Sequence, residues 1–406
     1  MADEPMNAQQ PEHDPADGWR FDTRAVRAGQ VRSPFEETSE ALYLTSGYVY
    51  GTAEEAAAAF RGEIDRHRYS RLSNPTVTML QDRVRALEGA EAGVATARGM
   101  AAVFSALLAA TKTRDRVVAG RSLFGSCFVI LDEILPRYGI TCDFVDGEDL
   151  AQWRAALATP AQAVFFESPS NPMQTLVDIA AVTELAHAAG ALVIVDNIFA
   201  SPLYQRPLEL GADVVVYSTT KHMDGQGRTL GGVILGSQAF VDGELQPLMR
   251  NTGPVLSPFN AWVVLKSLET MRLRVERMTE TALAIGTWLQ EQPGVTWVRH
   301  PWMPSHPQHE LARAQMTGGG TVLTFEVAGG KPRAFALQNA LRTIDISNNF
   351  ADAKSLITHP SSTTHEKLGS AGRAAIGLTD GTLRLSVGLE DPQDLEDDLA
   401  QALRIT

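Results

Sequence analysis

The chain has 406 residues, of which 44% are hydrophobic and 20% are charged. This length and apolar content predict a globular protein with more than one sub-domain and exclude wholesale disorder. The formal charge of -13 opposes binding to nucleic acid, because a phosphate backbone is also negative. The two cysteines, Cys127 and Cys142, are too few for a disulfide framework or a thiolate metal site.

The sequence also shows no membrane or export signal. No apolar run reaches the roughly 18 residues that a membrane-spanning helix needs. The first residues, MADEPMNAQQPEHDPADGW, are polar and acidic, which predicts a tail rather than a signal peptide. We therefore expect a cytoplasmic protein with no membrane partner.

The first helix signals lie before residue 112. Thr52 and Glu55 form a capping-box pattern at the start of TAEEAAAAFRG, and Gly62 is a typical helix terminator. Apolar residues at helical spacing predict two more helices, TVTMLQDRVRALEG (76–89) and MAAVFSALLAAT (100–111).

Between residues 115 and 236 the pattern changes to short aliphatic runs separated by helix-like segments. Continuous apolar runs are typical of strands buried on both faces, as in a parallel sheet covered by helices. The segment VDIAAVTELAHAAG (177–190) predicts a crossover helix, so the region predicts an α/β layer structure. The predicted strands are RVVAG (116–120), AVFFES (163–168), ALVIVDN (191–197), DVVVYS (213–218) and GGVILG (231–236).

A long helix and a second group of strands follow. The segment SPFNAWVVLKSLETMRLRVERM (257–278) predicts one continuous helix that leaves the sheet. GTVLTFEV (320–327) and TLRLSVGL (382–389) predict strands of a smaller C-terminal domain, with a boundary near GPVLSP (253–258).

Polar residues follow three of the predicted strands, at the strand ends where open α/β sheets bind ligands. Asp196 ends one apolar run, and Lys221, one of only six lysines, follows the next. Either residue alone is more often a turn or surface residue, but together they match a pyridoxal phosphate site. That cofactor needs a lysine for its Schiff base, an acid for its pyridine nitrogen and a cradle for its phosphate.

Candidate phosphate ligands lie in two places along the chain. Ser218 and Thr220 offer hydroxyl groups near Lys221, and Gly99 and Met100 begin a predicted helix. Free N–H groups and the dipole at a helix N-terminus favour a phosphate, and Gly99 permits its close approach.

Other ligand motifs are incomplete. GQGRTLGG (225–232) has two glycines at dinucleotide-binding spacing but Leu230 in the third position, and it does not follow a strand. SHPQHE (305–310) places His306 and His309 three residues apart without further ligands, which favours surface histidines over a metal site. We therefore expect no metal.

From about residue 22 to the C-terminus, the chain resembles the Cys/Met-metabolism family of pyridoxal-phosphate enzymes. The resemblance implies an α/β, aspartate-aminotransferase-like (fold type I) architecture, with a mostly parallel central sheet and a smaller C-terminal α/β domain. The motifs that carry it are YSRLSNPT (69–76), ARGMAA (97–102), ESPSNP (167–172), VDN (195–197), STTKH (218–222), SLITHP (355–360) and LRLSVGLE (383–390).

The same resemblance implies how the chain is divided and assembled. Residues 1–70 would form a tail and an arm that contributes to the neighbouring subunit's site, 71–256 a PLP-binding α/β domain, and 257–406 a C-terminal domain. Tyr69 and Arg71 would reach the neighbour's cofactor phosphate, so the sites would be shared within a dimer. The expected assembly is a homotetramer of two such dimers.

The resemblance also implies residue roles. Lys221 would bind pyridoxal 5'-phosphate covalently and move protons, with Tyr69 assisting, while Asp196 would pair with the pyridinium nitrogen. Arg is the expected residue for a carboxylate, because a guanidinium forks onto both oxygens. The remaining cofactor residues would be Gly99, Met100, Ser218, Thr220 and Phe124, and those for the substrate α-carboxylate would be Arg384, Asn171 and Ser347.

Two positions depart from the wider family pattern. Phe124 stands where many members have a tyrosine, so it can stack on the cofactor ring but cannot donate a proton, which weakens a lyase assignment. Arg98 replaces the usual small residue before Gly99. A phosphate-side or substrate contact and a surface ion pair both remain open for Arg98.

Within the family, several segments resemble the O-succinylhomoserine sulfhydrylase branch: LYLTSGYVYGTAEEAAAAFRGE, SLFGS, MDGQGR, GPVLSPFNAW and MPSHPQHELAR. The implied reaction converts O-succinyl-L-homoserine and sulfide to L-homocysteine and succinate in methionine biosynthesis. Cystathionine γ-synthase and γ-lyase activities remain alternatives because they use the same cofactor residues. The acetyl ester as substrate, and a catalytically inactive PLP-binding regulator, also remain open.

Overall fold

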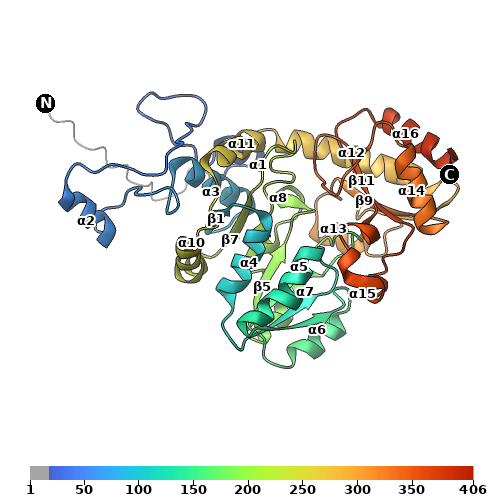
Figure 1. Cartoon of the computed structure of the whole chain (residues 1–406), viewed down its shortest axis with the longest axis horizontal. Coiled ribbons are helices and arrows are strands. Elements are labelled where there is room, and N and C mark those ends of the chain that lie inside the picture. The colour runs from blue at the N-terminus through green and yellow to red at the C-terminus, as the bar shows by residue number, and fades with distance from the viewer. Residues whose placement is uncertain (1–17, 406) are drawn as a thin grey trace.

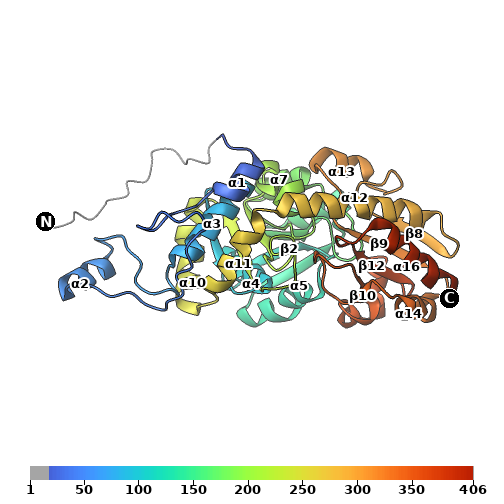
Figure 2. The ribbon, with the colours of Figure 1, turned by 90° about the horizontal axis from the view of Figure 1, so that it is seen from above.

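The computed structural model describes residues 18–405, so residues 1–17 of the predicted tail lie outside the described residues. Two β-sheets with separate hydrophobic cores lie along the long axis of the molecule (Figure 1). An N-terminal arm that carries helix α2 (Ala53–Arg61) stands away from both sheets (Figures 1 and 2). In the described part of the chain, no helix is both long enough and apolar enough to cross a membrane.

The larger sheet has the strand order β1-β7-β6-β5-β4-β2-β3. The neighbours from β6 to β3 pair in parallel, whereas β7 runs antiparallel to both β1 and β6. The prediction of a mostly parallel sheet is therefore confirmed, with β7 as the antiparallel exception. Its strands are β1 (Ala92–Thr96), β2 (Arg116–Gly120), β3 (Thr141–Val145), β4 (Ala163–Glu167), β5 (Leu192–Asp196), β6 (Val214–Tyr217) and β7 (Gly232–Gly236).

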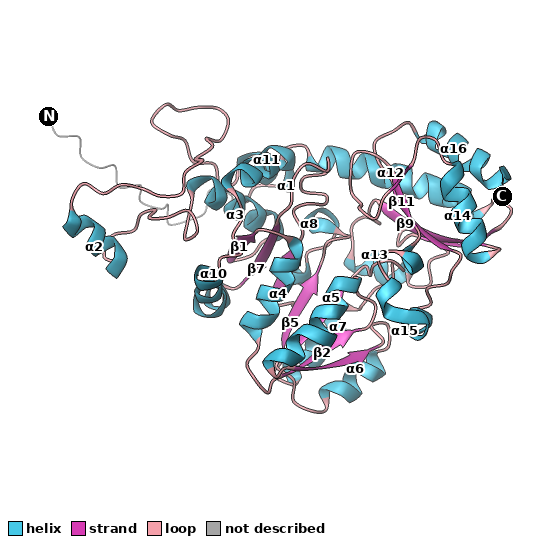
Figure 3. Cartoon of the chain, in the orientation of Figure 1, coloured by secondary structure: helices cyan, strands magenta, loops and turns pink. Residues whose placement is uncertain are grey.

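Helices cover both faces of this sheet (Figure 3). Successive residues of β4 show why its sequence is continuously apolar: Phe165 packs into the core with α4, and Phe166 packs with α6 and α7 on the opposite face. The predicted crossover helix is α7. The helices of this part are α1 (Phe21–Arg27), α3 (Pro75–Glu88), α4 (Gly99–Ala110), α5 (Gly125–Val129), α6 (Leu150–Leu157), α7 (Ile179–Ala188), α8 (Ser201–Tyr204), α9 (Gln238–Phe240), α10 (Gln246–Thr252) and α11 (Pro258–Leu268).

Two strands of the larger sheet, β1 and β3, lie outside the sequence prediction. β1 reads AGVAT, and its small residues have low strand propensity. Gly93 is small because a Cβ there would lie 2.5 Å from Leu235 Cδ2 of the neighbouring strand. β3 is an edge strand with alternating exposure, so it lacks the continuous apolar run of the buried strands.

The prediction of one continuous helix over 257–278 is wrong. Helix α11 ends at Leu268, and a separate helix, α12 (Met271–Gln290), follows. The carbonyl of Ser267 accepts hydrogen bonds from Thr270 N at 3.2 Å and from the side chain of Arg274 at 2.9 Å. These bonds take the acceptor that a continuing α-helix would use, so the chain turns before α12 runs on to the smaller sheet (Figure 1).

The smaller sheet has the order β10-β11-β12-β9-β8 and is antiparallel except for the pair β10–β11. Its core contains side chains of α12, α14 and α16. The two strands predicted here are β9 and β12. The elements are β8 (Val295–Arg299), α13 (His309–Gln315), β9 (Val322–Val327), α14 (Gly330–Ala340), β10 (Asp345–Ile346), β11 (Leu356–Thr358), α15 (Gly369–Ala375), β12 (Thr382–Ser386) and α16 (Pro392–Ile405).

The prediction that His306 is a surface histidine is wrong. Only 4% of this residue is exposed. Its Nε2 lies 3.0 Å from the carbonyl oxygen of Gln174, and its Nδ1 accepts a 3.1 Å bond from Gln308 N. Burial lowers the pKa of His306 to about 4. Nε2 therefore docks this loop onto the loop that follows β4, whereas Nδ1 holds the turn within its own loop.

Candidate active site

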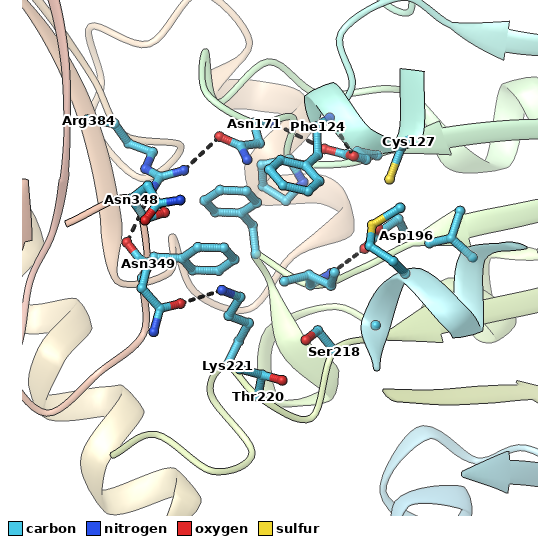
Figure 4. A pocket seen from close by; sticks show the side chains of 18 of the residues that line it. Phe124, Cys127, Asn171, Asp196, Ser218, Thr220, Lys221, Asn348, Asn349 and Arg384 are labelled. Carbon is cyan, nitrogen blue, oxygen red and sulfur yellow. Dashed lines mark hydrogen bonds between the residues drawn. The ribbon is translucent and has the colours of Figure 1, made fainter. Parts of the chain in front are cut away.

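A cavity of about 330 Å³ lies between the carboxyl ends of strands β4, β5 and β6 and the smaller sheet (Figure 4). Ligands bind at such strand ends in open α/β sheets. The predicted site residues that line it are Gly99, Met100, Phe124, Asn171, Asp196, Ser218, Thr220, Lys221 and Arg384.

Asp196 is the last residue of β5 and is 4% exposed. Its Oδ1 accepts a 3.1 Å hydrogen bond from Ile198 N. Burial raises the pKa of Asp196 to about 7. Among residues 18–405 no lysine or arginine forms an ion pair with this carboxylate, so a protonated ring nitrogen in the cavity would supply the missing positive charge.

Lys221 lies in the turn that follows β6. Its Nζ donates a hydrogen bond to Asn349 Oδ1 and lies 4.4 Å from the ring centre of Phe350 (Figure 4). Burial, and secondly the positive charge of Arg384, lower the pKa of Lys221 to about 8. A larger fraction of its amine is therefore neutral near pH 7 than for an exposed lysine, as a nucleophile or base requires.

The start of helix α4 forms a cradle of the size and charge that a phosphate needs. The side chain of Arg98 does not cap this helix. A Cβ on Gly99 would lie 2.7 Å from Ser218 Cβ, so only glycine lets the helix approach Ser218 this closely. The hydroxyls of Ser218 and Thr220 line the same cavity. Backbone N–H groups, the helix dipole and two hydroxyls together fit a phosphate group.

Arg384 enters the cavity from strand β12 and is 1% exposed. Its Nη1 donates to Asn171 Oδ1 at 2.9 Å, and its Nη2 donates to the carbonyl of Asn348 at 2.8 Å (Figure 4). Its Nε is buried and has no partner in the described part of the chain. Burial lowers the pKa of Arg384 to about 10, which leaves it a cation at neutral pH. The guanidinium is thus oriented, charged and ready for a carboxylate.

Comparison with known proteins agrees with this geometry. Residues 22–404 match the model of the Cys/Met metabolism PLP-dependent enzymes. The chain belongs to this family. It is 60% identical over 393 residues to the O-succinylhomoserine sulfhydrylase of Mycobacterium tuberculosis, covering 95% of this chain and 96% of the relative.

Two further comparisons extend the family relationship. The O-succinylhomoserine sulfhydrylase of Pseudomonas aeruginosa is 48% identical over 387 residues, covering 95% of this chain and 96% of the relative. The crystal structure of a cystathionine gamma synthase from Xanthomonas oryzae pv. oryzae aligns with a TM-score of 0.90 and 32% identity, covering 95% and 98% of the two chains. The predictions of the family, of the fold and of pyridoxal phosphate as cofactor are confirmed.

Sequence reasoning missed Glu167, which lies beside Asp196 in this PLP enzyme. Glu167 Oε1 accepts a 2.7 Å bond from Phe124 N, and Oε2 accepts a 3.3 Å bond from Asn171 N. A carboxylate oxygen of Glu167, a carboxylate oxygen of Asp196 and Cys127 Sγ all lie within 4.8 Å of one another. Burial and the charge of Asp196 raise the pKa of Glu167 well above its usual range. The signal was available, because Glu167 ends an apolar run as Asp196 does.

Asn348, Asn349 and Phe350 were also missed. They follow β10 of the smaller sheet and line the cavity beside Lys221 and Arg384. The ring of Phe350 stacks on that of Phe199, with 4.5 Å between centres and 2° between planes. The adjacent Ser347 was predicted from the family resemblance, but nothing in ISNNF itself indicates that the fold brings this loop to the lysine.

Ser347 and Arg98 do not line the cavity. Ser347 Oγ accepts a 3.2 Å hydrogen bond from Asn349 N, and Ser347 lines a neighbouring cavity. Arg98 is exposed and donates a 3.0 Å bond to the carbonyl of Ala97. Within the described residues, Arg98 forms no ion pair, and its side chain hydrogen-bonds to no other predicted site residue.

Tyr69 and Arg71 also lie outside the cavity of their own chain. Tyr69 is 46% exposed and pairs as an isolated bridge with Gly47. The guanidinium of Arg71 lies 5.7 Å from the Tyr69 ring centre and donates to the carbonyl of Arg250. Both residues line a separate, open cavity of about 470 Å³ beside Val255.

Proposed function

We propose that this enzyme replaces the γ-substituent of O-succinyl-L-homoserine with sulfide, producing L-homocysteine and succinate. The observation that carries the substrate assignment is the 60% identity, over 95% of the chain, to the sulfhydrylase of M. tuberculosis. The cavity supports the chemistry, because it combines a half-buried lysine, a buried acid and an unpaired guanidinium donor.

Bound pyridoxal phosphate supplies an electron sink for the charge that develops when a proton leaves the substrate. Lys221 Nζ would hold the cofactor covalently and, as a neutral amine, would take the proton from the substrate Cα. Asp196 would hold the ring nitrogen of the cofactor in its protonated form, because a carboxylate close to that nitrogen stabilises the positive charge. The helix start at Gly99 and the hydroxyls of Ser218 and Thr220 hold the phosphate. Phe124 would stack on the cofactor ring, and its apolar face would exclude water.

Arg384 binds the substrate α-carboxylate. Its Nη groups are fixed by Asn171 and Asn348, while Nε stays open. Asn171 contributes its amide to the same carboxylate, and Ser347 orients the loop through Asn349. Lys221 is hydrogen-bonded to Asn349 of the same loop, which keeps the proposed base close to the residues proposed for the carboxylate.

The active sites are shared between subunits. In this proposal residues 1–70 contain the arm, 71–256 form the cofactor domain, 257–406 form the C-terminal domain, and the dimers pair as a homotetramer. The arm exposes large apolar side chains, among them Leu44 at 68%, Val49 at 89% and Phe60 at 69%. Such a surface favours burial against another copy. Tyr69 and Arg71, which are remote from their own cavity, then complete the neighbour's phosphate site, and Tyr69 assists its proton transfers.

We place this step of methionine biosynthesis in the cytoplasm. Both Cys127 and Cys142 are free thiols. Unpaired cysteines suit a reducing compartment, because disulfides form in oxidising ones.

Product analysis tests the proposal. Purified holoenzyme is given O-succinyl-L-homoserine with either sulfide or cysteine, and the products are identified by mass spectrometry. Homocysteine and succinate from sulfide, with little cystathionine from cysteine, would support the sulfhydrylase. Cystathionine as the main product would replace it with a γ-synthase, and 2-oxobutyrate formed without a thiol would replace it with a γ-lyase. A yellow protein that turns over no substrate would indicate a PLP-binding regulator.

A further inference from the structure

A second cavity of about 860 Å³ adjoins the active-site cavity. The two share three lining residues, Met100, Phe124 and Asn348. Ser347 lines the second cavity and receives the backbone N–H of Asn349, the residue that binds Lys221. A substrate that is bound by Arg384 can therefore extend past Phe124 from the first cavity into the second.

The two walls of this second cavity come from different parts of the chain, one packed on the larger sheet and one on the smaller sheet. Helix α5 and the turn that follows it form one wall, and the loop around Thr364 forms the other. A Cβ on Gly125 would lie 2.4 Å from the carbonyl oxygen of Thr364, so the two walls are in close contact at this point. Val129, Ile130 and Ile346 give the walls an apolar part, which suits a short hydrocarbon chain.

One cationic side chain, Lys367, lines this cavity. It lies in the short helical turn Glu366–Leu368. Lys367 is exposed, and within residues 18–405 no acidic side chain forms an ion pair with it. Thr363 and Thr364 line the same cavity, but Thr363 Oγ1 donates to the carbonyl of His359 at 2.9 Å and Thr364 Oγ1 is hydrogen-bonded to His365 Nδ1 at 2.7 Å. The Lys367 amine is therefore the group in this wall that can donate charge-assisted hydrogen bonds to a carboxylate.

The proposed substrate carries two carboxylates, and Arg384 accounts for one of them. Resting on that proposed function, we propose that the second cavity is the acyl subsite, in which Lys367 binds the distal carboxylate of the succinyl group. The two methylene groups of the succinyl chain lie between this carboxylate and the ester, and they pack on the apolar part of the wall. An acetyl ester has neither the second carboxylate nor the methylene groups, so this subsite selects the succinyl ester.

Glu366 sharpens the proposal because it lines the same cavity next to Lys367. Its carboxylate repels an incoming carboxylate, whereas the Lys367 amine attracts it. Removing the two charges should therefore change the preference for the succinyl ester in opposite directions. If Lys367 had only a structural role, the two substitutions would not be expected to change the preference in opposite directions.

The test measures kcat/KM with O-succinyl-L-homoserine and with O-acetyl-L-homoserine, each with sulfide, for the holoenzyme and its variants. In Lys367→Gln the succinyl-to-acetyl ratio should fall about tenfold through a higher KM, since one charge-assisted bond is lost. Lys367→Arg should restore most of the ratio, and Glu366→Gln should raise it. Lys354→Gln is the matched control, because Lys354 is exposed, pairs with Asp352 and lies outside both cavities.

The outcomes separate this inference from the proposed function. A wild-type enzyme that forms homocysteine, with an unchanged ratio in Lys367→Gln, overturns the acyl subsite and leaves the sulfhydrylase intact. A ratio that falls equally in Lys354→Gln also overturns it, because the effect is then one of net charge. A wild-type enzyme that forms homocysteine from neither ester overturns the proposed function, and the acyl subsite falls with it.

Discussion

The two walls of the active-site cavity are built in different ways. On the larger sheet, Asp196 ends the buried strand β5 and Lys221 lies in the turn after β6, so the residues that we propose for the cofactor from the same chain come mainly from this wall. On the smaller sheet, Arg384 projects from within β12 and Asn349 comes from a loop. Cofactor binding and substrate binding should therefore respond separately to mutation, except at Asn349, which reaches across to Lys221.

The largest effect should come from the cofactor wall. Lys221→Ala removes the group that binds the cofactor covalently and moves the Cα proton, so turnover should fall below detection. The absorbance band of the covalently bound cofactor should be lost, while the thermal unfolding temperature of the apoenzyme stays close to that of the wild type. Lys354→Ala, at an exposed lysine outside the cavity, is the control. Retention of most activity in Lys221→Ala would remove the lysine from the reaction.

A mutation in the substrate wall should weaken substrate binding and leave the cofactor in place. Arg384→Lys keeps a positive charge but loses the fork that contacts Asn171 and Asn348. We expect kcat/KM to fall roughly 100-fold, mainly through KM, because truncating one partner of a buried charged contact costs on the order of 2–5 kcal/mol. The cofactor spectrum should be unchanged. Loss of the bound cofactor in this variant would contradict the separation of the two walls.

The N-terminal arm is a third region, and mixing two inactive variants tests whether its Arg71 acts in the active site of the neighbouring subunit. Arg71→Ala and Lys221→Ala subunits should each be inactive alone. After the two are unfolded and refolded together, hybrid dimers contain one site with both lesions and one intact site, so activity should return to about a quarter of the wild-type level. Mixing without exchange of subunits is the control. No recovery in verified hybrid dimers would place Arg71 in its own chain's site or outside the site altogether.

The larger-sheet wall was largely predictable, because its signals are local. Strands buried on both faces have continuous apolar runs, so a charged residue at the end of such a run is conspicuous, as Asp196 is. Glu167 meets the same criterion at the end of β4 and could have been found in the same way. β1 and β3 could not, because a strand of small residues and an edge strand with alternating exposure carry no such pattern.

The smaller-sheet wall was predictable only through the family motifs. Arg384 lies among apolar residues of β12, and its charge becomes useful only when the fold brings Asn171 from the larger sheet to meet it. Asn349 carries no signal in its own segment, since its partner Lys221 lies 128 residues away in the chain. The burial of His306 likewise depends on the loop at Gln174, which packs against it from the other sheet. Contacts between sheets, and not local pattern, decide these positions.

The smallest effect should come from Asn349, the residue that joins the two walls. Burial, and secondly Arg384, hold the pKa of Lys221 at about 8. The amine must be neutral to attack the cofactor aldehyde, so the rate of apoenzyme reconstitution with pyridoxal phosphate should rise with pH and level off above about 8.

Asn349→Asp places a negative charge beside the amine, which favours its protonated form, raises its pKa and should move this profile to higher pH. Asn349→Ala should slow reconstitution several-fold without the alkaline shift, because only a positioning hydrogen bond is lost. The rate of reconstitution is followed by absorbance at each pH under identical salt. If wild type and Asn349→Asp give the same pH profile, the charge at position 349 does not affect the pKa of Lys221.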